Sequence, residues 1–333
     1  MDERALFAAV LAERYGLAGA ELSPLSSSPG AISHSFLVER PGKGRAVLHA
    51  YRDAWVEVVA PHETVAAHVA GLVALLDAFA AREYPAPRLV RARDGAATVT
   101  WGEWSLLLVG YVAGEPADYA PDSLRGLGAA VGRLHALPPP LPAIESWWSL
   151  GSAVPPALAR LDAGAATVPP AWRDWHDTCR ATLATALTWA DLPQALIHAD
   201  AWIGNTLRTA AGEFVLIDWE CAGRGLAVLD LGSLLIHAHY DLPDHAPLPE
   251  RIAAVLDGYL AHRQPTAAEL AVLPQATQFG PAFRSALFYF RAQQRGWDEA
   301  IERHLTRERG RFGPCAALGE MARAWLERWA SPQ

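Results

Sequence analysis

The pattern of hydrophobic and polar residues divides the chain into a strand-rich first third and a longer helical part. Leu6, Val10 and Leu11 recur at helical spacing, which predicts a helix within residues 1–17. Short apolar runs typical of strands follow, and a helix is predicted between the third and fourth of them. The expected strands cover residues 21–25, 33–38, 46–52, 97–101 and 104–111, and the expected helix covers 63–80.

From residue 113 onward the periodicity is mainly that of helices. Asp230 stands at the start of the apolar run LGSLLIHAH, where it is expected to cap a helix. Helical insertions are expected between residues 146 and 191. Further separate helices are predicted at residues 121–137, 250–262, 267–272, 281–294, 298–309 and 316–329.

Polar side chains follow two short apolar runs in the middle of the chain. Asp200 and Asn205 come after the run at 195–197, and Asp218 comes directly after the run at 214–217. A turn signal lies between the runs, so we expect them to pair as a hairpin with the three polar residues at one end. Two carboxylates and an amide oxygen suit a hard cation such as Mg²⁺. A carboxylate not used by the metal could accept a proton from a hydroxyl group.

The spacing of these residues resembles a known family. His-x-Asp-x-x-x-x-Asn, at His198, Asp200 and Asn205, is followed by Ile-Asp-Trp around Asp218. This pattern is similar to the catalytic and metal-binding loops of the aminoglycoside phosphotransferases, a family that includes choline and homoserine kinases. The resemblance implies that Asp200 is the catalytic base, that Asn205 and Asp218 hold Mg²⁺ on ATP, and that His198 braces the loop. The simpler alternative is a strand–loop–strand whose Asp and Asn residues cap turns.

The resemblance also implies an α+β fold with two lobes, as in protein kinases. A small lobe with an antiparallel sheet, residues 1–112, would bind the nucleotide. A larger, mainly helical lobe, residues 113–333, would carry the catalytic loop and the acceptor site.

Two segments of the first lobe match the family's ATP-binding elements. Ser27, Ser28 and Gly30 lie where the family keeps its phosphate-covering loop, and small residues let backbone amides approach phosphate oxygens. The run LLLVGYVAGEP resembles the hinge, whose backbone at Val109 and Tyr111 would meet adenine.

The third predicted strand departs from the family pattern. The family usually has a lysine or arginine there to grip the phosphates, whereas the matching position here is His49. The chain has a single lysine, Lys43, in the preceding turn. His49 could donate a hydrogen bond to a phosphate, or Arg45 or Arg52 could reach it.

Composition narrows the setting and the partners. The 333 residues carry a net charge of −8 without a basic stripe, so no nucleic-acid partner is expected. Cys179, Cys221 and Cys315 are too few and too scattered for a disulfide framework, and no apolar run is long enough to span a membrane. We expect a cytoplasmic monomer or homodimer.

The acceptor is expected to be a small molecule with a hydroxyl group, such as an antibiotic, a sugar or an amino alcohol. Residues 241–333 carry as many acidic as basic side chains, which argues mildly against a polycationic aminoglycoside. Trp202 and Trp297 could stack on a planar, sugar or cationic acceptor.

Two other functions fit part of the pattern. A kinase-like protein could bind a nucleotide or ligand without transferring phosphate, which His49 in place of lysine would explain. The same carboxylates could also serve a metal-dependent hydrolase acting on water, although that reading explains neither the serine-rich loop nor the hinge-like strand.

Overall fold

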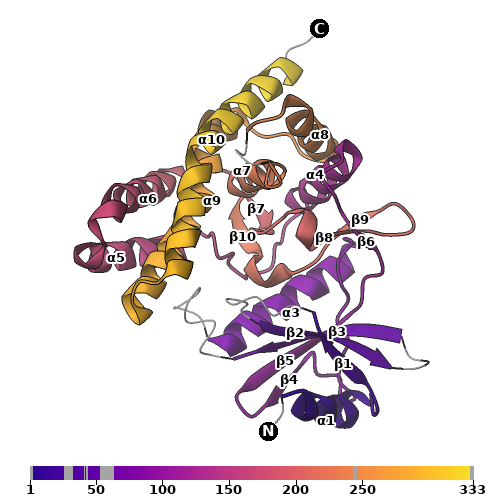
Figure 1. Ribbon diagram of the computed structural model, residues 1–333. Coiled ribbons are helices and arrows are strands. Elements are labelled where there is room, and N and C mark those ends of the chain that lie inside the picture. Colours follow the sequence, from indigo (N-terminus) through magenta and orange to yellow (C-terminus); the bar gives the residue numbers. More distant parts are fainter. Residues whose placement is uncertain are drawn as a thin grey trace. The chain divides into compact units, whose positions relative to one another are not determined.

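The chain divides into two compact units, residues 1–113 and 114–333 (Figure 1). In this computed structural model the described residues are 3–25, 33–40, 42, 44–52, 64–242 and 246–330. None of the described helices is both long enough and apolar enough to cross a membrane.

The first unit is built on a five-stranded antiparallel sheet. Its spatial order is β1-β2-β3-β5-β4. The helices α1 (Glu3–Tyr15) and α3 (Val65–Ala81) lie on opposite faces of it (Figure 1). The strands are β1 (Glu21–Pro24), β2 (Ser33–Arg40), β3 (Gly44–Tyr51), β4 (Thr98–Trp101) and β5 (Trp104–Gly110). The predicted strands and both helices are therefore confirmed, with ends that differ by one or two residues.

Alternation along β3 decides which side chains face each helix. Leu48 points to one face, where it packs in a core with Phe7 of α1. His49, as its neighbour, points to the other face, as does Tyr51, whose ring lies 5.9 Å from that of His68 on α3. His49 therefore lies on the α3 side of the sheet.

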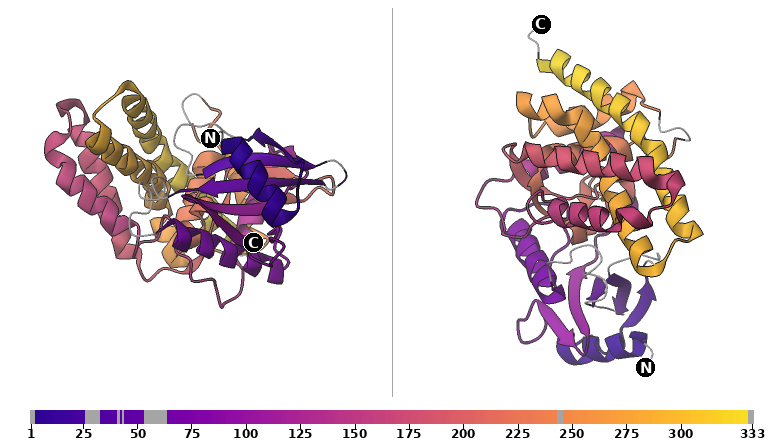
Figure 2. Two further views of the ribbon diagram at one scale, coloured as in Figure 1. Left: turned by 90° about the horizontal axis from the view of Figure 1, so that it is seen from below. Right: turned by 90° about the vertical axis from the view of Figure 1, so that its left-hand side faces the viewer.

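The second unit is mainly helical, and α9 lies at its centre. This helix packs against α5, α6, α7 and α10 (Figure 2). The α-helices are α4 (Pro121–His135), α5 (Val154–Gly164), α6 (Arg173–Ala186), α7 (Ala227–His237), α8 (Pro249–Leu260), α9 (Ala267–Arg295) and α10 (Glu299–Ala330). Single 3₁₀ turns are η1 (Ala165–Thr167), η2 (Pro170–Trp172), η3 (Leu187–Trp189), η4 (Ile203–Asn205) and η5 (Trp219–Cys221).

The last two helices are longer than the sequence predicted. The segments expected as separate helices at 267–272 and 281–294 form one helix, α9, and those at 298–309 and 316–329 form α10. Prolines lie inside both helices, and each removes one backbone donor at a local cost of about 3 kcal/mol. The hydroxyl of Thr277 lies 2.7 Å from the carbonyls of Pro274 and Cys315, which ties the two helices together at this point. Their long mutual contact outweighs the local cost.

The strands around residues 195–226 pair differently from the predicted hairpin. β7 (Gln194–Ile197) pairs with β10 (Gly223–Leu226), and β9 (Phe214–Leu216) pairs with β8 (Thr206–Arg208), which also pairs with β6 (Glu115–Pro116). The prediction that the runs at 195–197 and 214–217 form a hairpin is wrong. The chain becomes extended again directly after Asn205, so β8 is the nearer partner for β9 across the turn.

Candidate active site

The predicted base, Asp200, lies in a loop that connects β7 to β8. The side-chain amide of Asn205 donates to Oδ2 of Asp200 at 2.8 Å and to its backbone carbonyl at 3.0 Å. Both N–H groups of that amide therefore point at one residue, and the amide oxygen of Asn205 is directed elsewhere. Asn205 fixes the Asp200 carboxylate and keeps an acceptor atom for another partner.

Asp218 joins this pair although the predicted hairpin does not form. The backbone N–H of Ile217 donates to the carbonyl of Asn205 at 2.9 Å, which places the next residue, Asp218, beside the loop. Burial and the nearby charge of Asp218 raise the pKa of Asp200 to about 7. Burial also raises the pKa of Asp218. The predicted convergence of Asp200, Asn205 and Asp218 is therefore present.

Asp230 fixes the backbone at the start of the Asp200 loop. Its carboxylate is fully buried and accepts the backbone N–H groups of His198 at 2.8 Å and of Ala199 at 2.9 Å. It also lies 3.0 Å from Nε2 of His135, whose Nδ1 lies 2.8 Å from the hydroxyl of Tyr259. Burial alone would raise the pKa of Asp230, but the hydrogen bond and charge of His135 and the loop amide lower it. Asp230 is thus ionised, and it acts within α7 rather than as the predicted cap, since α7 begins after Leu226.

His198 has the bracing role that the family resemblance implied. Its ring is fully buried, lies 4.6 Å from that of Trp219, and has Nε2 3.0 Å from the carbonyl of Ile217. Nε2 must therefore carry the proton and donate to that carbonyl. Burial lowers the pKa of His198, so the ring is a neutral tie between the two strands.

The residues present fit a divalent cation. Asp218 receives no hydrogen bond from any other described residue, and the amide oxygen of Asn205 is directed away from Asp200. Among the described residues, no three His, Cys, Asp or Glu side chains are grouped to hold a metal. A cation here would need water or ligand oxygens as well, which is how Mg²⁺ usually binds.

The predicted nucleotide-binding residues belong to the first unit. Ser27, Ser28 and Gly30 lie outside the described residues. The half-buried His49 has Nδ1 2.9 Å from the hydroxyl of Ser35, and burial lowers the pKa of His49 to about 4. His49 is therefore neutral at pH 7.

The hinge-like segment is paired to β3. Val109 lies opposite Val47, and the backbone N–H of Tyr111 donates to the carbonyl of Arg45 at 3.3 Å. The guanidinium of Arg45 lies 3.9 Å from the centre of the Tyr111 ring. The backbone N–H of Tyr111 is thus already hydrogen-bonded. A bound nucleobase would therefore have to contact the backbone carbonyl or the ring of Tyr111.

Sequence reasoning missed a charged group close to Asp200. Arg284 on α9 donates from Nε to Glu308 on α10 at 3.1 Å and from Nη2 to the hydroxyl of Tyr240 at 3.1 Å. Its positive charge acts to lower the pKa of Asp200. No motif marks Arg284, because the packing of α7, α9 and α10 alone brings it here.

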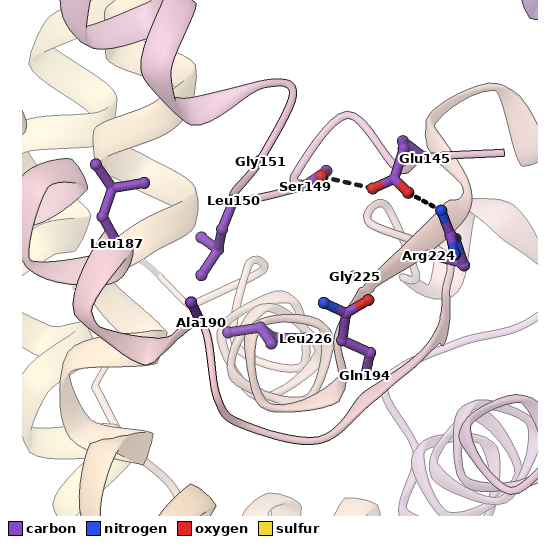
Figure 3. Close-up of a pocket in the computed structure, with 10 residues that line it drawn as sticks. All are labelled: Glu145, Ser149, Leu150, Gly151, Leu187, Ala190, Gln194, Arg224, Gly225 and Leu226. Carbon is purple, nitrogen blue, oxygen red and sulfur yellow. Dashed lines mark hydrogen bonds and ion pairs between the residues drawn. The ribbon is translucent and has the colours of Figure 1, made fainter. Parts of the chain in front are cut away.

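A separate cavity of about 400 Å³ lies at the other end of the β7–β10 pair (Figure 3). Glu145 forms an ion pair with Arg224 at its edge and accepts a hydrogen bond from Ser149 at 2.7 Å. Gln194, at the start of β7, lines it, whereas the Asp200 loop follows the end of that strand. The cavity is therefore distinct from the Asp200 loop.

Known proteins share both sequence and fold with this chain. The homoserine kinase of Methylobacterium radiotolerans is 30% identical over 205 residues, which cover 61% of this chain and 63% of that kinase. The chain thus spans less than two thirds of the length of this relative. A microcompartment-associated aminopropanol kinase superposes with a TM-score of 0.66 at 20% identity, covering 98% of this chain and 97% of the kinase. An amicoumacin kinase solved with AMP-PNP and Ca²⁺ gives 0.65 at 15% identity, covering 99% and 94%.

These structures confirm the predicted α+β fold of the protein-kinase type, with an antiparallel sheet in the first part of the chain and helices in the second. The profile of the phosphotransferase enzyme family matches residues 26–273, which include the phosphate-loop segment, β3, the hinge-like segment and the Asp200 loop. The chain belongs to the phosphotransferase enzyme family.

Proposed function

We propose that this protein transfers the γ-phosphate of ATP to a hydroxyl group of a small molecule. The observation that carries the proposal is the 2.8 Å hydrogen bond from Asn205 to Asp200, with the solvent-accessible carboxylate of Asp218 near enough to raise the pKa of Asp200. One carboxylate is held in place as a base, and the other keeps its oxygens open to a cation.

Asp200 would orient the acceptor hydroxyl and take its proton. A general base works best when its pKa lies near the working pH, and the pKa of Asp200 is about 7. Asn205 and Asp218 would hold Mg²⁺, which when bound offsets negative charge on the phosphates. Asn205 and Asp230 would supply rigidity, since most of the rate gain in such transfers comes from positioning and electrostatics.

The nucleotide would be held by the first unit, through Ser27, Ser28, Gly30 and the backbone near Val109 and Tyr111. His49, being neutral at pH 7, would contribute a hydrogen bond to a phosphate rather than a charge. Support comes from the family profile, which covers these segments. A cytoplasmic location, where ATP is abundant, completes the proposal and agrees with three free cysteines.

The test is acceptor-dependent ADP formation by wild type and by Asp200→Asn. The variant keeps the shape of the side chain and an oxygen for Asn205, but it cannot accept the proton. We expect a loss on the order of 10²-fold or more in kcat. Asp191→Asn, at an exposed aspartate, is the matched control and should retain full activity. Equal turnover by wild type and Asp200→Asn would refute the assignment of the base.

His49 favours a second candidate, a nucleotide-binding protein without transfer. In that case ATP with Mg²⁺ would raise the melting temperature, and no hydroxylated acceptor would yield ADP. Asp200→Asn would then leave the only measurable property, nucleotide binding, intact.

A further inference from the structure

Three arginines surround one buried glutamate next to the catalytic loop. Glu308 is fully buried and accepts from Arg284 at 3.1 Å, from Arg311 at 3.1 Å and from Arg307 at 3.3 Å. We call these four residues the arginine cluster. One carboxylate offsets only one of three guanidinium charges, so the arginine cluster is strongly positive, although residues 241–333 are balanced as a whole.

Arg284 is the member of the arginine cluster that faces the catalytic loop. Its charge acts on both Asp200 and His237. Yet no hydrogen bond and no ion pair within 4.0 Å joins Arg284 to Asp200. The two groups interact electrostatically without touching, and 23% of the Arg284 side chain remains exposed.

A short series of contacts links Arg284 to the Asp200 loop. His237, at the end of α7, has Nδ1 3.0 Å from the carbonyl of Ala201, the residue after Asp200. The His237 ring lies 4.4 Å from the ring of Tyr240, whose hydroxyl accepts from Arg284. A molecule of a few carbon atoms could therefore place a hydroxyl at Asp200 and its opposite end at Arg284.

The guanidinium of Arg284 has N–H donors that its two protein hydrogen bonds do not use. It has five N–H groups, and its bonds to Glu308 and Tyr240 use two of them. No other described residue takes the remaining three. Glu308 and Tyr240 fix the plane of the guanidinium, so little entropy is lost when a ligand binds. A planar fork with free N–H groups on its outer edge matches a carboxylate.

We propose that Arg284 binds a carboxylate on the acceptor, so that the substrates are small hydroxy acids or hydroxy amino acids rather than amines alone. The inference rests on the proposed phosphotransfer function and specifies its acceptor. A cationic group in place of that carboxylate would meet the positive charge of Arg284, whose partner Glu308 is already shared with Arg307 and Arg311.

The first test needs no variant. Hydroxy acids of three to five carbons, homoserine among them, are each compared with their primary amide and with the amine that lacks the carboxyl group. Wild type should show a kcat/KM for each acid at least 10-fold above that for its amide or amine. A preference for the amides or amines, with Asp200-dependent ADP formation, would overturn the inference and leave phosphotransfer standing. ADP formation with none of the acceptors would refute both.

The second test separates binding from mere structural support. Arg284→Gln should lower kcat/KM for the acids at least 10-fold more than for the amides, which lose only what the missing charge near Asp200 costs both substrates, and Arg284→Lys, which keeps that charge, should recover part of the loss. The matched control is Arg307→Gln, since Arg307 also contacts Glu308 but its side chain is 49% exposed. Equal losses for acids and amides in Arg284→Gln would show a structural role only and would overturn the inference.

Discussion

The hydrogen bonds of Asp230 give the sharpest prediction for the Asp200 loop. Asp230→Asn keeps the size of the side chain but replaces one carboxylate oxygen by an N–H donor. Three donors point at this carboxylate, two from the backbone of His198 and Ala199 and one from His135. At least one of them must then face another donor in a fully buried place.

The size of the effect follows from these contacts. A buried donor left without an acceptor costs about 1–3 kcal/mol, and each of the two remaining hydrogen bonds loses roughly 1 kcal/mol when its acceptor becomes neutral. The free energy of unfolding should therefore fall by about 3–5 kcal/mol, a large share of a typical total of about 5–15 kcal/mol. The loop should also relax at Ala199, which has a left-handed φ of 62°. A shift of Asp200 by about 1 Å should lower kcat on the order of 10²-fold.

Urea unfolding followed by tryptophan fluorescence tests this value, because most of the 13 tryptophans belong to residues 114–333. With a slope of about 2–3 kcal/mol per molar urea, the midpoint should move down by roughly 1–2 M. Asp177→Asn is the control, since the Asp177 side chain is 78% exposed and should change stability by no more than about 0.5 kcal/mol. Asp230→Asn that unfolds within about 1 kcal/mol of wild type and keeps its activity would show that the loop does not depend on this carboxylate.

Three further predictions follow from the second unit. Burial and nearby Arg284 lower the pKa of His237 from 6.5 to about 3. The unfolded chain therefore binds the extra proton first, and His237 should cost about 2 kcal/mol of stability between pH 7 and pH 5, a loss absent in His237→Asn. Gly132→Ala should destabilise α4 by roughly 1–3 kcal/mol in thermal melts, because a Cβ there would lie 2.6 Å from the carbonyl of Tyr259, whereas Gly310→Ala has open space and should not. Asp218→Asn should abolish the Mg²⁺-dependent part of the rise in Tm that ATP causes, and a rise equal to that of wild type would place the cation elsewhere.

The sheet of the first unit could be predicted from the sequence because its signals are local. Alternating apolar residues in β2, β3 and β5 mark both the strands and the face that packs on α1. The proximity of the loop residues could also be predicted, since Asp200 and Asn205 are five residues apart and Asp218 follows the strand β9. In both cases the residues that define the feature are close together in the chain.

The pairing of β7 could not be predicted in the same way. Its partner, β10, lies beyond Asp218 in the chain. The nearer strand, β9, pairs with β8 instead, so it is not available to β7. The lengths of α9 and α10 escaped prediction for a similar reason. Pro274, Pro281 and Pro314 weaken a helix considered alone, whereas the contact between the two helices stabilises both.

Asp230 shows why the supports of a site are harder to find than its reactive groups. An aspartate at the start of an apolar run is typical of a helix cap, and that was the expectation here. Its actual partners, His198 and His135, are 32 and 95 residues away, and no spacing in the sequence records either distance. The proposed reactive groups are therefore easier to identify from the sequence than the residues that hold them in place.

The geometry of the loop is costly for the chain to maintain. Ala199 and Asp218 have left-handed φ values of 62° and 64°, which cost a non-glycine residue about 1–2 kcal/mol each. The charges of Asp200 and Asp218 also repel each other. The opposing contributions come from residues outside the reactive set, above all Asp230 with its three donors and Arg284 with its charge. The same fold that fixes Asp200, the proposed base, thus places a positive group near it, and the proposed acceptor carboxylate would bind that group without displacing Glu308 or Tyr240.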